Sequence, residues 1–280
     1  MKIFKLIGYD IKQGFRENAG KLAVLMGITL FCCIDFWVYR SNCYYGEIVP
    51  QGTYMDYLLY FLAGAKEYVP GLDETVPFPA RWLLLQSYLL YGGLSYSVRD
   101  MTGMGAVVLA KAETRWQWWL AKCVWNGLYI ICSYGLIYLG TGIWCVCAGE
   151  KLSLSVTASV MNKMLKVTAL SDPCPIGLTV DILLIPLCTM IALSILQLTL
   201  ILFVPPVFGF VSLEVLFVCS IYFCNGWFIG NYAMPLRSEY MKGQGFTMEQ
   251  AMIVNVLLCC ILVFVGGRRF QRYDILPKED

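Results

Sequence analysis

The sequence predicts an all-α membrane protein with six transmembrane helices, an N-terminal amphipathic helix at the membrane surface, and short re-entrant or interfacial helices on the outer side. The mean hydropathy is +0.64. Of the 280 residues, 59% are hydrophobic and 14% are charged, whereas about a quarter of the residues in a soluble domain are charged. Apolar runs of about twenty residues, the length that crosses a bilayer, recur along the whole chain.

We expect residues 1–280 to form a single transmembrane domain. More than half of the 21 lysines and arginines lie in the N-terminal tail, in the connector between the second and third runs, and in the C-terminal tail. This bias predicts that both termini are cytoplasmic and that the connector's cations, Lys122 included, are exposed at that face. Pro186 predicts a kink or break in the fourth span. The spans are expected at about residues 22–39, 82–98, 123–146, 182–204, 207–229 and 250–266, followed by a cytoplasmic tail at 267–280.

The first segment, residues 1–20, has its apolar residues at helical spacing. Ile3, Ile7 and Ile11 recur on one side, and lysines occupy other positions around the helix. This pattern predicts an amphipathic helix that lies in the plane of the inner leaflet, with its apolar face in lipid. A plain basic tail is the alternative.

The predicted outer segments contain two short helices. Residues 54–65 are apolar but too few to cross a bilayer, so we expect a re-entrant or interfacial helix there. Residues 156–167 indicate a short amphipathic helix. Most of the 13 cysteines lie in apolar runs, where they act as small hydrophobic residues. Cys43 and Cys174 fall in outer segments, so a disulfide between them is left open.

Two acids lie within predicted spans. Asp35 is near the outer end of the first span, and Glu214 is about two turns into the fifth. Charged groups in a membrane are costly and usually functional, so both residues are candidates for a substrate path. A structural contact with another helix is the alternative for both, and simple snorkelling toward water is a further alternative for Asp35.

Several classes of site are excluded by composition. Histidine is absent, which excludes imidazole metal ligands and histidine-based catalytic triads. No G-x-x-x-x-G-K-[ST] motif occurs, so this chain does not bind ATP through a P-loop. We therefore expect no metal, no cofactor and no enzymatic activity on this chain. The net charge of +2 gives no indication of nucleic-acid binding.

The connector between the second and third spans, residues 98–122, combines charges with tryptophans. Residues 111–115 form a short polar turn. Trp116, Trp118 and Trp119 then predict an aromatic belt where the next helix enters the lipid. Such a connector can serve as a handle for a soluble partner, and an ordinary charged loop with interfacial tryptophans is the alternative.

Two motifs in the chain resemble those of a known family. The first reads Arg99-Asp100, then Gly103-x-Gly105, a Thr114-Arg115 step, and Trp118-Trp119-x-x-Lys122. The second reads Gly267-Arg-Arg-Phe-Gln-Arg-Tyr-Asp-Ile-Leu276. In this order and spacing they resemble the first cytoplasmic loop and the closing segment of type-2 ABC exporter permeases, the membrane subunits common in Gram-positive bacteria.

The resemblance implies a permease subunit of an ATP-binding-cassette transporter in the bacterial cell membrane. Its substrate would be amphipathic or hydrophobic, such as a peptide antibiotic, a lipid or a toxin, and export is the expected direction. A separate cytoplasmic ATPase would carry ATP and Mg, and a second permease chain, identical or not, would complete the pore. The family's loop holds a coupling helix that inserts into the ATPase, and this assigns coupling to Lys111, Glu113, Thr114, Arg115 and Trp116.

A second hypothesis is a membrane-embedded immunity or sensor protein that binds an antimicrobial peptide without transport. The long outer segments favour it, whereas the two cytoplasmic motifs oppose it. Membrane lipids are partners under either hypothesis. The sequence identifies neither the substrate nor the roles of Asp35 and Glu214.

Overall fold

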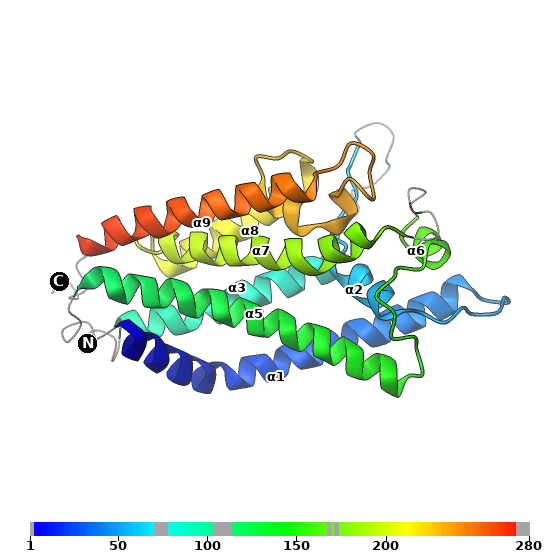
Figure 1. Cartoon of the computed structure of the whole chain (residues 1–280), viewed down its shortest axis with the longest axis horizontal. Helices are drawn as coiled ribbons and strands as arrows, with labels where there is room; N and C mark the ends of the chain where they lie inside the picture. The colour runs from blue at the N-terminus through cyan, green and yellow to red at the C-terminus, as the bar shows by residue number, and fades with distance from the viewer. Residues whose placement is uncertain (1–2, 70–77, 103–113, 167–169, 171–173, 273–280) are drawn as a thin grey trace.

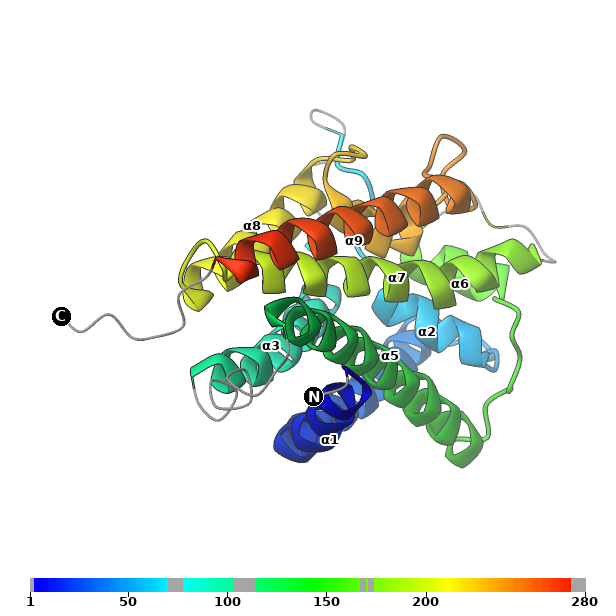
Figure 2. The same cartoon turned by 60° about the vertical axis from the view of Figure 1, so that its left-hand side comes forward.

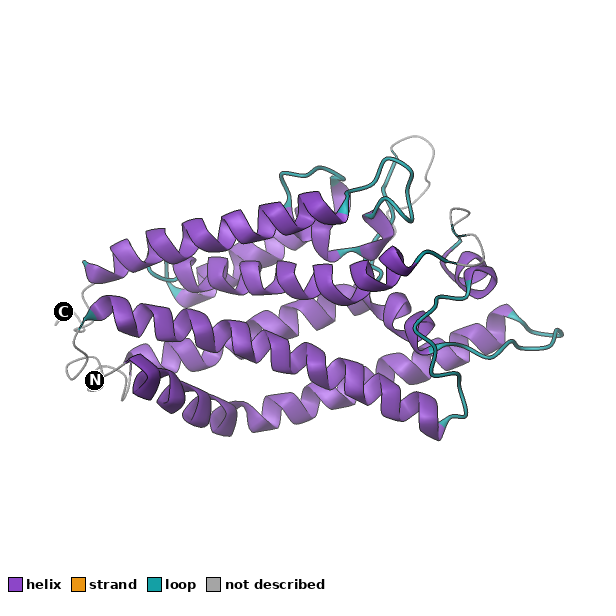
Figure 3. Ribbon diagram, in the orientation of Figure 1, coloured by secondary structure: helices purple, strands orange, loops and turns teal. Residues whose placement is uncertain are grey.

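The chain folds into an elongated bundle of helices (Figure 1), and no strand occurs among the residues that the computed structural model describes (Figure 3). These residues are 3–69, 78–102, 114–166, 170 and 174–272. The elements are α1 (Ile3–Cys43), α2 (Tyr54–Leu62), α3 (Ala80–Thr102), α5 (Arg115–Cys147), α6 (Ala158–Leu165), α7 (Ile176–Leu200), α8 (Pro206–Tyr222), the 3₁₀ turns η1 (Ile229–Ala233) and η2 (Pro235–Arg237), and α9 (Met248–Gln271).

The long helices run along the bundle between two distinct ends. We call the end at which α1 and α5 begin and α3 and α9 finish the connector end, and the opposite end, which holds α2 and α6, the far end (Figure 1). Figure 2 shows α5 between α1 and α7, and α9 packs against the other side of α7. α5 therefore contacts the elements on both sides of the bundle.

Four helices in the described residues are long and apolar enough to cross a membrane, namely α1, α5, α7 and α9. The chain is therefore a membrane protein of helical type. The predicted count of six spans is not confirmed by length and composition, because α8 has 17 residues and α3 is more polar. Two of the polar residues of α3, Gln86 and Ser97, are fully buried inside the bundle rather than turned outward.

The N-terminal segment does not form a separate helix. α1 continues from Ile3 to Cys43 without interruption, and Figure 1 shows that it bends in its first half. The fully buried face of this half carries Leu6, Asp10 and Asn18, and of the predicted stripe of Ile3, Ile7 and Ile11 only Ile7 packs against the cluster around Leu6 among the described residues. The predicted helix in the membrane plane is thus not confirmed, because a buried partner for Asp10 draws a polar face inward.

The boundaries of the other long helices differ from the predicted spans. α5 begins at Arg115 and not near residue 123, because the Thr114 side chain caps it by accepting a hydrogen bond from the backbone N–H of Gln117 at 3.3 Å. The helix thus includes part of the predicted connector. α7 continues through Pro186, so the helix is not broken there.

At the far end, α2 is a buried helix rather than an interfacial one. Its residues from Met55 to Leu62 are all buried. A capping box starts the helix, since the Asp56 carboxylate accepts a hydrogen bond from the backbone N–H of Thr53 at 2.9 Å. The same carboxylate also accepts one from the backbone N–H of Thr157 at 2.8 Å. Burial raises the pKa of Asp56, and these hydrogen bonds oppose the shift. Asp56 therefore attaches α2 to the start of α6, the short helix expected within residues 156–167.

Two buried arginines hold the far end together. Arg40 forms an ion pair with Glu150 in which both side chains are almost fully buried, and Glu150 also accepts the Tyr57 hydroxyl at 3.1 Å. Arg237 instead donates to main-chain carbonyls, with Nη2 2.7 Å from the oxygen of Ile221 at the end of α8. Such contacts satisfy carbonyl groups that a helix end leaves without partners.

The cysteines form no disulfide. All 13 are free thiols within the described residues. This includes Cys43 and Cys174, so the pairing that the sequence left open is absent from this structure.

Candidate functional site

The connector end brings together the two segments that carry the family resemblance. Trp118 stacks on Phe270 with ring centroids 4.7 Å apart and planes inclined by 6°. Trp119 lies 6.1 Å from the same ring, and its indole N–H donates to the carbonyl oxygen of Val263 at 2.9 Å. The start of α5 is thereby fixed to the end of α9.

Two consecutive glycines of α9 make this packing possible. A Cβ atom on Gly266 would lie 2.1 Å from Cζ2 of Trp119, and one on Gly267 would lie 1.8 Å from Cζ3 of Trp116. No side chain fits at either position while the indoles remain in place. The two glycines therefore leave room on α9 for the tryptophan rings of α5.

Two of the three residues of the predicted aromatic belt do not face outward. Trp118 and Trp119 are 1% and 0% exposed, so they fill the space between helices. Trp116 is half-buried. Interfacial tryptophans and buried ones look alike in a sequence, because the partner rings and glycines come from a segment about 150 residues away.

A buried cluster of charges lies beside the tryptophans. The Lys122 ammonium is 2.6 Å from Oδ1 of Asp10 in α1 and 2.5 Å from Oδ2 of Asp100 at the end of α3. The Lys122 side chain is 0% exposed, and those of the two acids are 1% and 6% exposed. The expectation that Lys122 is an exposed connector cation is therefore wrong, since its ammonium lies between two carboxylates from other helices.

Hydrogen bonds extend the cluster across the bundle. The Tyr96 hydroxyl donates to Oδ1 of Asp10 at 3.0 Å. The Asn126 amide donates to Ser97 at 3.0 Å and accepts from the Ser194 hydroxyl of α7 at 3.1 Å. Polar contacts thus join α1, α3, α5 and α7 at one level. Oδ2 of Asp10 has no hydrogen-bond partner among the described residues.

The connector is anchored at both of its ends. The connector leaves α3 just after Asp100 and enters α5 just before the tryptophans, so both of its ends are tied to buried contacts. No group of three cysteine or acidic side chains placed to hold a metal ion occurs within the described ranges. A displacement of the connector would be transmitted to α1, α3 and α9 through packed side chains.

Sequence reasoning missed Asp10, Asp100 and the burial of Lys122. One signal was present: Lys122 follows Trp118 by four residues and therefore lies on the same face of the helix. A cation on a face of large aromatic residues indicates burial with a partner.

Three of the five predicted coupling residues can be placed. Thr114 caps α5 as described above. Arg115 is exposed, and its guanidinium donates to the Gln271 carbonyl at 3.4 Å. Trp116 covers Gly267, whereas Lys111 and Glu113 lie outside the described residues.

Asp35 and Glu214 are not brought together. Asp35 forms a half-exposed ion pair with Arg81 at the start of α3 and accepts the Tyr60 hydroxyl at 3.2 Å. Glu214 of α8 accepts the Ser87 hydroxyl at 2.7 Å. Both acids thus connect their own helices to α3. Their role in a substrate path stays a prediction.

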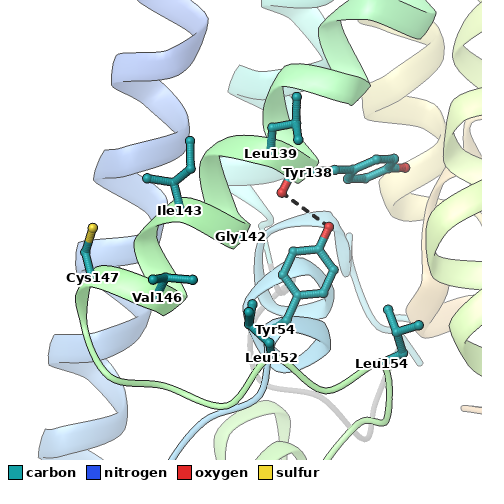
Figure 4. A pocket seen from close by; sticks show the side chains of 9 residues that line it. All are labelled: Tyr54, Tyr138, Leu139, Gly142, Ile143, Val146, Cys147, Leu152 and Leu154. Atoms are coloured by element: carbon teal, nitrogen blue, oxygen red, sulfur yellow. Dashed lines mark hydrogen bonds between the residues drawn. The ribbon is translucent and has the colours of Figure 1, made fainter.

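The far end offers a different kind of site, an apolar groove of about 540 Å³ (Figure 4). The last turns of α5 form one wall, and Leu152 and Leu154 form another. Its polar feature is the Tyr54 hydroxyl, which donates to the Tyr138 carbonyl at 3.3 Å. The groove suits an apolar group and has no charged side chain in its lining.

Comparison with known proteins leaves the family open. No protein-family model matches the chain, and no curated protein matches it. The resemblance to type-2 ABC exporter permeases therefore rests on the two motifs, and it stays a prediction.

Proposed function

We propose that this chain is the permease subunit of a type-2 ABC exporter in a bacterial cell membrane. It would move an amphipathic or hydrophobic substrate, and a separate ATPase subunit would bind ATP and Mg and drive the cycle. One observation carries the proposal: the two segments that resemble the family's first loop and closing segment pack on each other, with Trp118 stacked on Phe270. This contact supports a shared role for the two segments.

The buried charges supply the mechanism of this proposal. Closure of the ATPase would pull on the connector, and the Lys122 ion pairs would make α1 and α3 follow α5. The packed ends of the helices would then shift between two arrangements with different affinity for substrate. A second permease chain, identical or different, would provide the other half of the path.

The proposed topology has six spans, α1, α3, α5, α7, α8 and α9, with both termini in the cytoplasm. Intact cells treated with a membrane-impermeant maleimide should therefore show label on the native thiols of the far end, such as Cys43 and Cys147. An Arg272→Cys variant should gain label at that position only after lysis, as read by peptide mass spectrometry. Labelling of position 272 in intact cells would contradict the topology.

Arg115 tests the coupling assignment. Because Arg115 is exposed, Arg115→Glu should leave folding almost unchanged, within about 0.5 kcal/mol. In a docking groove the reversed charge should weaken ATPase binding at least about 30-fold, since breaking a desolvated charge pair costs about 2–5 kcal/mol. The measurements are the amount of cellular ABC ATPase that co-purifies with the tagged chain, and ATP hydrolysis by the complex.

The matched control is Lys166→Glu, which alters the charge of an exposed residue of the far end. This variant should retain the ATPase. If Lys166→Glu and Arg115→Glu behave alike, the coupling assignment is wrong.

The groove of Figure 4 favours a second candidate function, an immunity or sensor protein that binds a peptide without transport. A peptide with apolar side chains would enter the groove from the outer side. Purification of the tagged chain discriminates between the two functions. A chain that binds an antimicrobial peptide and brings no ATPase with it would support the second candidate and exclude the first.

A further inference from the structure

A second groove, of about 420 Å³, opens at the connector end between α3, the turn that joins α7 to α8, and α9. Its walls are mainly apolar, and a single charged residue, Arg269, contributes to them. The lining consists of Val98, Met101, residues 201–206 and Arg269.

Arg269 is held over this groove by two contacts. Its Nε donates to the Leu202 carbonyl at 3.3 Å, and its guanidinium carbon lies 5.1 Å from the centre of the Phe203 ring. Arg268 precedes it and Arg272 follows it at the same end of α9. Within the part of the chain that the structure describes, none of these three arginines pairs with a carboxylate. Within the described residues the groove therefore has one cation, Arg269, that no carboxylate neutralises.

The groove continues onto an exposed apolar surface. Phe203, Val207 and Phe208 are exposed beside it, and Val211 and Val215 extend the surface along α8. A soluble protein that docked here would meet this apolar face next to the arginines. A molecule with an anionic head and long apolar chains would match both parts.

We propose that this groove binds an anionic phospholipid of the inner leaflet. The phosphate would contact the guanidinium of Arg269, and the acyl chains would follow the exposed face of α8. Basic pockets between membrane helices on the cytoplasmic side are suited to such headgroups. The inference rests on the topology given under the proposed function but not on transport or on an ATPase.

The test uses the purified full chain in a neutral detergent, titrated with a two-chain phosphatidylglycerol or with phosphatidylcholine, with binding followed by native mass spectrometry. Phosphatidylglycerol should bind more tightly than phosphatidylcholine. Arg269→Gln should weaken the binding of the first phosphatidylglycerol molecule by about fivefold, the factor expected for one basic residue near a membrane surface. Phe208→Ser, an exposed substitution on α8, should also weaken it.

Arg268→Gln is the matched control, because it removes the same charge from the adjacent residue, whose guanidinium lies over Phe264 instead. Equal weakening by both arginine variants would indicate diffuse surface attraction and overturn the proposal. Competition by glycerol 1-phosphate at the same concentration as the lipid would indicate a soluble phosphate site and overturn it too. Unchanged lipid binding by Arg269→Gln, with loss of a co-purifying ATPase, would assign the groove to protein docking.

Discussion

Lys122→Met is expected to reduce the free energy of unfolding by about 3–5 kcal/mol, the cost of leaving a buried charge without its partner. The substitution keeps a long apolar side chain but leaves Asp10 and Asp100 facing each other without a cation. The measurement is thermal unfolding of the purified chain in detergent, followed by tryptophan fluorescence. The amount of protein inserted into membranes should fall in parallel.

Two comparisons make this result specific. Adding Asp10→Asn and Asp100→Asn to Lys122→Met should restore most of the loss, because the buried charges are then removed together. Lys163→Met breaks a largely exposed ion pair with Glu47 at the far end and should cost no more than about 1 kcal/mol. If the Lys122 and Lys163 variants unfold alike, the buried cluster does not stabilise the bundle.

Gly266→Ala is expected to destabilise the contact between α5 and α9. The added methyl group would overlap the Trp119 ring, and overpacking of a filled interior typically costs about 1–3 kcal/mol. Thermal unfolding in detergent measures the effect, and a changed tryptophan emission spectrum should accompany it because the indole is displaced.

Trp119→Phe should rescue part of this loss. The smaller ring lacks the Cζ2 atom that a methyl group on Gly266 would meet, so the double variant should be more stable than additivity of the single variants predicts. Gly135→Ala provides the control within α5, since no atom lies within 4 Å of its added methyl group. It should be neutral or slightly stabilising, by about 0.5–1 kcal/mol at most.

Hydropathy predicted the helices that carry little polar sequence. The runs at 182–204 and 250–266 correspond to α7 and α9, and the turn at Pro205 separates α7 from α8 as expected. The errors occur where polar residues are buried. Lys122 and the neighbouring tryptophans are typical of a membrane interface, but α5 begins before them because Thr114 caps the helix. Local composition cannot show that a charge has partners on two other helices.

The far end illustrates the same limit. The short apolar stretch of α2 was correctly predicted to be too short to cross a membrane, but its position inside the bundle depends on contacts with distant residues. Asp56 contacts Thr157, about 100 residues away, and Glu150 contacts Arg40 over a similar separation. Such pairs form because the fold brings distant segments together. The order of apolar runs alone does not predict which segments meet.

The sequence predicted the segments of the candidate site but not the contacts between them. The connector and the closing segment were each recognised as unusual from their own residues. Their mutual contact could not be predicted, because about 150 residues separate Trp118 from Phe270 in the chain. The sequence around Asp10 in α1 gave no indication that its carboxylate has a buried partner.

The length of α1 sets the depth of the buried charges. At 1.5 Å per residue, its 41 residues measure about 60 Å along the helix, twice the roughly 30 Å of a hydrocarbon core. In the proposed topology, part of α1 therefore extends beyond the lipid tails. Asp10 is within its first three turns, so in the proposed topology the charged cluster lies toward the cytoplasmic headgroups, where an ion costs far less than at mid-membrane. Because α1 bends in its first half (Figure 1), a push on the cluster at Asp10 would act first on the segment before the bend.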